Sequence, residues 1–309
     1  MKAIGFSTPG GPEVLTRLEL PDPHPGPVEV RIRVAAAAVN PTDTTLRSGR
    51  RPLDAVAPPY VPGMDAAGVV DEVGDGSRWQ VGDEVMAIAL PLGEHRGAYA
   101  EYLIAPDDSL TRMPAGSSIE EAATLPMNGL TATQVLERLA LRPGQTLAVL
   151  GAAGALGGYA VQLAKHAGLV VIADAAEKDR DLVAGFGADH VVARGDDVAD
   201  RIRDVVPDGV DAVLDAALLH ERAAAAVRDG GAMAVVRGWD GDPGRGITVH
   251  KIAVAAEYHS GGKLDELRRL AEDRTLTLRV ADILPAEQAA EAHRRLEAGG
   301  VRGRMVLRF

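Results

Sequence analysis

One stretch, residues 146–165 (TLAVLGAAGALGGYAVQLAK), limits what this chain can fold into more than any other. It begins with the apolar run 147–150, which is typical of a short strand buried on both faces. A glycine-rich segment, 151–157, follows at once and leads into a pattern of helical period. A strand, a glycine-rich turn and a helix in this order are the context in which a nucleotide-binding motif is credible.

The residues of this turn suit a phosphate group. Small side chains let the backbone approach a pyrophosphate, and the start of a helix offers unpaired N–H groups and the positive end of a dipole. The motif G-x-G-x-x-G aligns on Ala152, Gly154 and Gly157, so alanine replaces its first glycine. Taken alone, the segment also fits a tight turn without a ligand, and the rest of the chain must decide between the two.

Strands and helices alternate on both sides of this stretch, from about residue 119 to residue 255. A serine followed by Glu120 and Glu121 resembles a helix N-cap with acids in the first turn. The predicted helices and strands that follow are helices at 178–186 and 223–228 and strands at 170–173, 190–193, 212–214 and 232–236. This βαβ alternation predicts an α/β fold with a doubly wound parallel sheet.

The remaining parts of the chain have a different pattern. Residues 1–118 are β-rich, and prolines at 21, 23, 25 and 27 mark an exposed, extended segment. Short strands at close spacing predict a small barrel-like β domain, with strands at 28–34, 68–74 and 83–88. Residues 256–309 contain both helical and strand patterns. They predict helices at 263–273 and 285–296, the second capped by Gly299 and Gly300, and strands at 278–280 and 304–307.

Composition excludes several classes of protein and of site. The chain has 309 residues and no cysteine, which excludes disulfides, thiol catalysis and metal sites with cysteine ligands. A net charge of −11 argues against a nucleic-acid partner. No apolar run approaches the ~18 residues that span a bilayer, and the first residues lack the apolar core of a signal peptide. We therefore expect no membrane partner and a cytoplasmic location.

The order of these parts resembles a known family, the zinc-free quinone oxidoreductases, which are the zeta-crystallin-like branch of the medium-chain dehydrogenases/reductases. The resemblance covers nearly the whole chain, and alanines are common in the glycine loop of this branch. It rests on the segments 39–43, 47–49, 59–70, 81–85, 97–102, 123–126, 129–132, 151–165, 289–296 and 303–307.

The resemblance implies a fold, a cofactor and an assembly. A GroES-like catalytic domain, residues 1–118 and 256–309, would be split in sequence by a Rossmann domain at 119–255. The cofactor NAD(P)H would lie in the cleft between them. Members of the branch commonly dimerise through edge strands of their Rossmann sheets, so we expect a homodimer, and 247–252 is the candidate edge.

The resemblance also implies a site without metal. Relatives that use zinc hold it with cysteine and histidine, but Asn40 and Met64 stand at those positions here. The eight histidines show no metal-ligand spacing, and His95 is expected on a solvated loop. Without a Lewis acid, the substrate must accept hydride readily. A quinone or a conjugated enone does so, because its distal oxygen takes up the developing charge.

By the same resemblance, one set of residues is assigned to the substrate cleft and one to the cofactor. The substrate-cleft residues are Asn40, Asp43, Tyr60, Met64, Asn128 and Trp239. The cofactor-binding residues are Asn40, Thr131, Gly151, Ala152, Ala153, Gly154, Ala155, Leu156, Gly157, Asp174, Lys178, Arg194, Ala216, Arg237, Gly238 and Arg304.

Three of these assignments have structural alternatives. Tyr60 is the candidate catalytic proton donor, but it also reads as an aromatic residue that packs beside prolines. Asp43 also reads as the cap of a helix at 42–47, and Trp239 as an exposed loop residue rather than a cover for the cofactor. Residues 215–219, which follow the predicted strand at 212–214, also depart from the family, which often has two glycines there.

The form of the cofactor is left open by conflicting signals. Asp174 ends the second strand, ~20 residues after the glycine loop, where an acid binds the ribose hydroxyls of NAD. This favours NADH slightly. Most of the branch uses NADPH, however, and Lys178, Arg180 and Arg194 are near enough in sequence to bind a 2′-phosphate. These basic residues also read as ordinary surface charge.

Two other functions remain as alternatives to a quinone or enone reductase. One is an enoyl reductase that acts on a carrier-bound or CoA thioester, which a basic entrance to the site would favour. The other is a non-catalytic dinucleotide-binding protein with a structural or redox-sensing role, which a blocked substrate cleft would favour.

Overall fold

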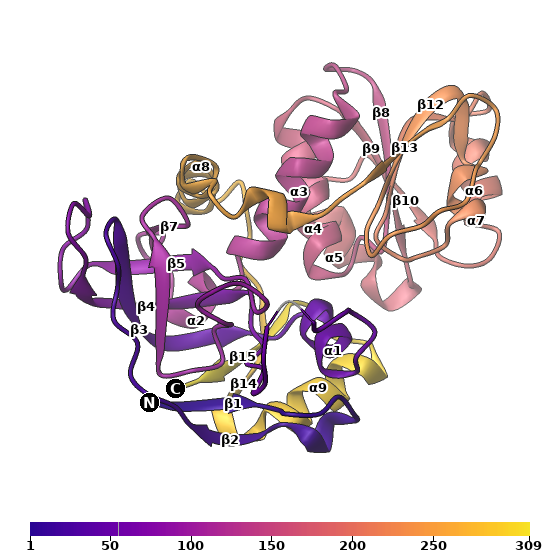
Figure 1. Ribbon diagram of the computed structural model, residues 1–309. Helices are drawn as coiled ribbons and strands as arrows, with labels where there is room; N and C mark the ends of the chain where they lie inside the picture. The colour runs from indigo at the N-terminus through magenta and orange to yellow at the C-terminus, as the bar shows by residue number, and fades with distance from the viewer. Residues whose placement is uncertain (55) are drawn as a thin grey trace. The chain divides into compact units, whose positions relative to one another are not determined.

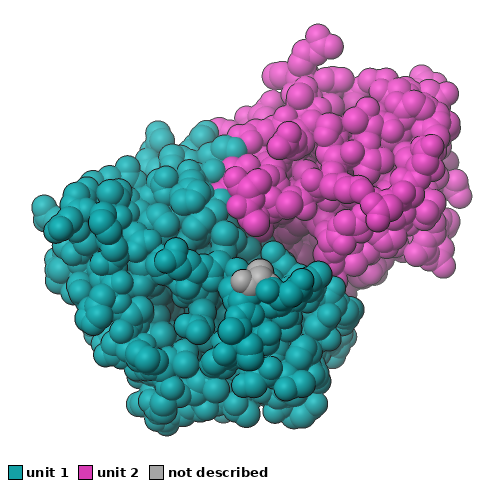
Figure 2. Space-filling view, viewed as in Figure 1, with its two compact units in different colours: residues 1–127, 258–274, 278–309 teal, residues 128–257, 275–277 magenta. Residues whose placement is uncertain are grey.

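The structure is a computed structural model that describes residues 1–54 and 56–309. The chain folds into two compact units, coloured separately in Figure 2. Unit 1 contains Met1–Met127, Tyr258–Arg274 and Leu278–Phe309, and unit 2 contains Asn128–Glu257 and Thr275–Thr277. No described helix is long and apolar enough to cross a membrane.

Unit 2 is built on a six-stranded sheet in which each strand is parallel to its neighbours. In spatial order the strands are β10 (His190–Ala193), β9 (Val170–Ala175), β8 (Thr146–Leu150), β11 (Val210–Asp215), β12 (Val227–Val235) and β13 (Thr248–Lys251). The order reverses between β8 and β11, and α/β sheets bind ligands beyond the carboxyl ends of the strands at such a point.

Helices cover both faces of this sheet (Figure 1). The helical segments of this part of the chain are α3 (Pro126–Leu139), α4 (Ala155–His166), η2 (Glu177–Asp179), α5 (Arg180–Gly185), α6 (Val198–Val205), α7 (Glu221–Ala224) and η3 (Val254–Glu257). The inner strands are almost entirely buried, which explains why 147–150 is an unbroken apolar run. The predicted doubly wound parallel sheet is confirmed.

Unit 1 is β-rich, as predicted, and is built on a sheet of seven strands. Its strands are β14 (Val280–Pro285), β15 (Arg304–Arg308), β3 (Glu29–Ala38), β4 (Asp65–Val73), β5 (Glu84–Ile88) and β7 (Leu110–Arg112) in spatial order, with β6 (Tyr102–Pro106) paired to β3. Only β14 and β15 are parallel to each other. The pairing of β15 with β3 joins the last strand of the chain to the N-terminal segment, as the split GroES-like fold requires.

Short helical segments and one hairpin complete unit 1. They are β1 (Lys2–Gly5), η1 (Pro12–Val14), β2 (Thr16–Glu19), α1 (Pro41–Arg47), α2 (Ile119–Ala122), α8 (Gly261–Glu272), η4 (Ala286–Gln288) and α9 (Ala289–Ala298). Helix α2 begins as predicted, because the Ser118 Oγ accepts the N–H of Glu121 at 3.2 Å and the Glu121 carboxylate accepts the N–H of Ser118 at 2.8 Å.

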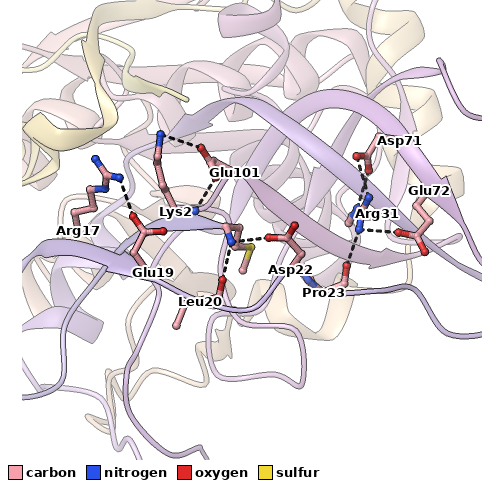
Figure 3. A network of polar contacts seen from close by, with 11 residues as sticks. Lys2, Arg17, Glu19, Leu20, Asp22, Pro23, Arg31, Asp71, Glu72 and Glu101 are labelled. Atoms are coloured by element: carbon pink, nitrogen blue, oxygen red, sulfur yellow. Dashed lines mark hydrogen bonds and ion pairs between the residues drawn. The ribbon is translucent and has the colours of Figure 1, made fainter.

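Ion pairs and hydrogen bonds hold the edge of unit 1 (Figure 3). The Arg31 guanidinium of β3 donates to Asp71 at 2.9 Å and lies 2.6 Å from Glu72, both at the end of β4. It also donates to the carbonyl oxygen of Pro23 at 3.0 Å, which fixes the proline-rich segment. The Lys2 N–H donates to the Glu101 carboxylate at 2.6 Å and fastens the hairpin to the chain before β6.

Two predicted elements in the second half of the chain are wrong in part. The helix predicted at 223–228 ends with α7 at Ala224, and β12 begins at Val227, which is fully buried and pairs with Val210. The strand predicted at 278–280 begins only at Val280 and continues to Pro285. Parallel pairing with β15 over these residues holds them extended, so the helix predicted from residue 285 starts later.

The candidate dimer edge forms a strand, β13, which pairs with β12 at one end of the order of described strands. Its Val249 and His250 side chains are half-buried, and its terminal residues are exposed. Pairing of two copies through this strand stays a prediction.

The packing of β4 gives a first test of the fold. A methyl group at Gly74 would lie 1.8 Å from the carbonyl oxygen of Gly26, so G74A forces the backbone to move. We expect the free energy of unfolding to fall by about 1–3 kcal/mol, as for other overpacked sites. G262A is the matched control, because a methyl group there meets nothing within 4 Å. Urea unfolding in which G74A is as stable as G262A would contradict this account.

Candidate functional site

The glycine loop of unit 2 joins β8 to α4, and two of its glycines are required by geometry. Gly151 has a φ of +82°, a region that favours glycine. A methyl group at Gly157 would lie 2.3 Å from the carbonyl oxygen of Gly151. Gly154 is the N-cap residue of α4. The backbone of the first turn of α4 therefore packs directly against the loop, and there is no room for a side chain at Gly157.

The Asp174 carboxylate at the end of β9 organises this loop from the neighbouring strand. Its Oδ1 accepts the N–H of Gly151 at 2.6 Å and of Ala152 at 3.2 Å, and the residue is 5% exposed. Burial raises its pKa, while these donors and the charge of Arg194 act in the opposite direction. Asp174 thus has a structural role that the sequence did not predict. Its contact with a ribose hydroxyl stays a prediction.

The basic residues predicted near the cofactor lie at the ends of β9 and β10. Lys178 is in η2 and Arg194 directly follows β10, and both are exposed. The Arg194 N–H donates to the carbonyl oxygen of Ala175 at 2.9 Å, which fixes its backbone beside the end of β9. The end of β9 therefore carries the Asp174 carboxylate, and the Arg194 guanidinium lies close to it.

The strand ends of β11 and β12 adjoin the glycine loop. The Ala216 N–H donates to the carbonyl oxygen of Leu150 at 3.1 Å, and a methyl group on Gly151 would lie 3.2 Å from Ala216. Arg237 and Gly238, after β12, are exposed and have left-handed φ angles of 64° and 73°. Trp239 is half-buried and stacks on a histidine, so it is not a freely exposed loop residue.

Two predicted residues lie on α3, where the structure assigns them to unit 2. Asn128 is 2% exposed and Thr131 is 6% exposed, so both side chains are inside the protein. One turn further on, the Gln134 side chain donates to the Glu257 carboxylate at 3.1 Å. This part of α3 presents polar groups within an apolar interior.

Unit 1 contains the second group of predicted residues, built around two buried carboxyl groups. Asp43 accepts the backbone N–H of Asn40 at 2.8 Å and that of Gly63 at 2.9 Å. Asp65 accepts the side-chain amide of Asn40 at 2.6 Å and the N–H of Met127 at 2.6 Å. Asn40 is therefore held from its backbone by one carboxyl group and from its side chain by the other.

The first of these bonds settles the role of Asp43 at the start of α1. Asn40 is the N-cap residue of this helix and Asp43 is its third residue, so the carboxylate caps an N–H that has no partner in the helix. The capping interpretation of Asp43 is confirmed. A contact between Asp43 and substrate stays a prediction.

Burial changes the acidity of both carboxyl groups. It raises the pKa of Asp43 to about 6 and that of Asp65 to about 7, because neither group has access to water. The N–H donors and the positive charge of Arg304, a buried residue of β15, reduce the shift. The charge of Asp43 adds to the rise in the pKa of Asp65.

A chain of hydrogen bonds connects Asp43 to the surface of unit 1. The Tyr99 hydroxyl lies 3.2 Å from Asp43 Oδ2 and 3.3 Å from His293 Nε2, and Arg47 Nη1 lies 3.5 Å from His293 Nδ1. Burial, with the charge of Arg47, lowers the pKa of His293 to about 3 and keeps it neutral. Arg47 also pairs with Glu297 at 2.6 Å.

The neutral ring fixes the direction of this chain. Arginine only donates, so Nδ1 of His293 accepts and Nε2 carries the proton. His293 then donates to Tyr99, and Tyr99 donates to Asp43. Oδ2 of Asp43 thus accepts from both Tyr99 and the Asn40 N–H, while its Oδ1 accepts the Gly63 N–H.

Two residues expected at the substrate cleft, Met64 and Tyr60, pack inside unit 1. Met64 is 2% exposed, and its carbonyl oxygen accepts the N–H of Ala89 at 2.9 Å. The Tyr60 ring is half-buried and lies 5.2 Å from the ring of Phe6, which supports its packing role. His95 was expected to be solvated, but its Nε2 lies 2.7 Å from Glu29 and its side chain is only 22% exposed.

Sequence reasoning missed Asp65, Tyr99 and His293. All three lie inside segments that carry the family resemblance, and each is polar within an apolar pattern. That contrast was the available signal, but their partners lie far away in the chain. Over residues 1–54 and 56–309, no cluster of three histidine or acidic side chains could hold a metal ion.

The buried carboxyl groups give a test by pH. A folded-state pKa above the unfolded value of ~3.9 means that the native protein retains protons that the unfolded chain releases. Stability should therefore fall as pH rises from ~4 to ~7, by up to ~1.4 kcal/mol per pH unit for each such group. We expect D65N to make the unfolding free energy less dependent on pH between pH 5 and pH 8.

The control for this measurement is D282N. Asp282 is exposed, and Arg295 lowers its pKa, so its loss should leave the slope unchanged in this range. If D65N and D282N gave the same slope as the unmodified chain, Asp65 would not carry the pH dependence.

Comparisons with known proteins place this architecture in a family. Residues 26–115 match the alcohol dehydrogenase GroES-like domain, and residues 186–307 match the zinc-binding dehydrogenase family. The NADPH-dependent alkenal/one oxidoreductase of Arabidopsis thaliana is 35% identical over 253 residues, which are 79% of this chain and 64% of the plant protein. The chain thus matches less than two thirds of that relative's length.

Solved structures match over the full chain. The crystal structure of an NAD-dependent alcohol dehydrogenase has a TM-score of 0.89 at 34% identity, and the match covers 100% of this chain and 100% of that one. The quinone oxidoreductase from Coxiella burnetii has a TM-score of 0.90 at 27% identity, over 100% of this chain and 99% of that one. With its glycine loop, its β-rich unit and these matches, the chain belongs to the quinone oxidoreductase branch of the medium-chain dehydrogenase/reductase superfamily.

Proposed function

We propose that this protein is an NAD(P)H-dependent oxidoreductase that reduces a quinone or a conjugated enone without zinc. The observation that carries the proposal is the glycine loop, where Gly157 approaches the Gly151 carbonyl oxygen too closely for any side chain. A loop of this kind between a parallel strand and a helix N-terminus fits a pyrophosphate. The names of the relatives, an alkenal/one reductase and a quinone oxidoreductase, supply the acceptor class.

The residues of unit 1 support chemistry without a metal. Asn40 and Met64, which stand where zinc-using relatives have ligands, are both buried. Asn40 is held by Asp43 and Asp65 and serves the protein's own hydrogen-bond network. An acceptor that places the developing charge on a distal oxygen needs less polarisation than a saturated ketone.

The chain's own contribution to such a reaction is binding and orientation. The dinucleotide, when bound, supplies a hydride. The N–H groups at the start of α4 would hold its pyrophosphate, and Asp174 fixes the loop through Gly151 and Ala152. Arg194 and Lys178 lie near enough to the end of β9 to favour a 2′-phosphate, whereas the carboxylate of Asp174 opposes one.

Turnover is the direct test of this function. We expect the purified protein to oxidise NADH or NADPH in the presence of a 1,4-quinone or a small enone. G157V should lower dinucleotide affinity at least tenfold, because the new side chain meets the backbone at 2.3 Å, while G185A, on an open helix surface, should bind normally. Binding without turnover on either acceptor would favour the non-catalytic alternative, and normal binding by G157V would contradict the role of the loop.

Cofactor preference depends on the charge at the end of β9. D174N removes the charge and keeps an oxygen that accepts the loop N–H groups. We expect kcat/KM for NADPH to rise about tenfold relative to NADH, which corresponds to ~1.4 kcal/mol of relieved repulsion. R194Q should change the ratio in the opposite direction. An unchanged ratio in both variants would show that these two charges do not select the cofactor.

A further inference from the structure

Two aromatic rings face each other beyond the ends of β11 and β12. The rings of His220 and Trp239 have centroids 5.6 Å apart and planes inclined by 15°. The histidine follows β11 and the tryptophan follows β12, so the pair lies at the carboxyl ends of the strands next to the glycine loop. In doubly wound sheets, that edge is where the bound ligand lies.

The backbone around His220 is strained and held in place by one carboxylate. Leu218 and His220 have left-handed φ angles of 61° and 55°. Asp215, whose side chain is fully buried, accepts the N–H of Ala217 at 3.2 Å, of Leu219 at 3.0 Å and of His220 at 2.7 Å. Strained conformations of this kind persist only where the surroundings impose them, and they cluster at functional sites.

The same carboxylate faces one nitrogen of the imidazole ring. His220 Nδ1 is buried, has no hydrogen-bond partner among the described residues, and lies 3.8 Å from Asp215 Oδ2. The side chain as a whole is 31% exposed. Part of the side chain is therefore open to solvent although Nδ1 is not.

This arrangement suits a histidine that transfers a proton. A protonated Nδ1 donates to Asp215 after a small shift of the ring, and catalytic hydrogen bonds are often long before the ligand binds. The charged group that faces the ring from the end of β11 is Asp215, and its charge also contributes to raising the pKa of Asp174 on the second strand along. Trp239 covers the opposite face of the ring without a charge.

We propose that His220 is the general acid that protonates the reduced acceptor, with Asp215 as its positioning residue and Trp239 as the wall that keeps its ring in place. This inference rests on the proposed reductase function. Hydride addition to the β-carbon of an enone forms a C–H bond and moves the π electrons toward oxygen, giving an enolate. The Nε2–H bond of the imidazolium then breaks, the proton goes to the enolate, and the neutral imidazole regains a proton from water.

The two acceptor classes differ in their need for this proton. An enolate accepts a proton at carbon slowly, whereas the oxygen of a hydroquinone anion takes one from water without help. Loss of the acid should therefore affect enone reduction far more than quinone reduction. General acids typically contribute 10²–10⁴-fold.

The kinetic test uses H220N, because asparagine tolerates a left-handed backbone, and H220F, which keeps a ring against Trp239. We expect kcat with the enone to fall about 100-fold in both variants, kcat with the quinone to fall less than about threefold, and dinucleotide affinity to remain unchanged. H259N is the control, since His259 is also paired with an aspartate, Asp108, at 2.7 Å but lies in unit 1. It should behave as the unmodified enzyme.

A second readout does not depend on turnover. In a W79F background, Trp239 is the remaining tryptophan, and a protonated imidazole stacked on an indole quenches its fluorescence. We expect Trp239 fluorescence to rise with increasing pH in a single transition, and this transition to be absent in H220F and H220N.

The outcomes separate this proposal from the proposed function. An active unmodified enzyme with fully active H220N, or with equal losses on enone and quinone, would overturn the role of His220 and leave the reductase function standing. The same holds if Y60F, rather than H220N, shows the enone-selective loss. An unmodified enzyme that reduces neither acceptor would overturn the function itself, even with the Trp239 transition present.

Discussion

The contact between Gly157 and the carbonyl oxygen of Gly151 is the constraint on which unit 2 depends. It brings the first turn of α4 against the end of β8, and no residue with a side chain satisfies it. Asp174 fixes the loop from the neighbouring strand, because its carboxylate accepts the N–H groups of Gly151 and Ala152. The Asp174 carboxylate thus occupies the donors of Gly151 and Ala152, which are different from the N–H groups at the start of α4 that are proposed to hold a pyrophosphate.

The structure of unit 1 depends on how it accommodates buried carboxyl groups. Two carboxyl groups, Asp43 and Asp65, are buried within reach of each other, where charge is expensive. The protein offsets this cost with directed donors from the backbone, an amide and a tyrosine, and with the charge of Arg304. The result is a buried polar cluster around Asn40 that is held together by hydrogen bonds. The pKa values of Asp43 and Asp65 remain raised because these donors and Arg304 compensate only in part for the effect of burial.

The sequence predicted those strands and helix ends that depend on residues close together in the chain. The predicted strand at 190–193 coincides with β10, and the predicted serine cap of α2 is present, at Ser118, because apolar runs and caps are properties of a few neighbouring residues. Val227 was assigned to a helix because its role in β12 depends on pairing with Val210, which no local pattern reveals.

The site residues that were missed share the same cause. Asp174 was identified as an acid at a strand end, but its bonds to Gly151 and Ala152 depend on how β9 lies beside β8. Asp65 meets Asn40 across 25 residues and Tyr99 meets His293 across 194. The family resemblance located the segments that contain these residues. It could not indicate which side chains within them face each other.

Two histidines show how the surroundings of one side chain decide its chemistry. His293 is fully buried, and a guanidinium donates to its Nδ1, so its ring is neutral and its Nε2 proton is committed to Tyr99. His220 has a carboxylate facing its Nδ1 and a side chain that is partly exposed. The first ring can only transmit a fixed hydrogen bond, because both of its nitrogens are occupied inside the protein. The second has one nitrogen beside a buried carboxylate and a side chain partly open to solvent, and its strained backbone persists because the buried Asp215 accepts its N–H.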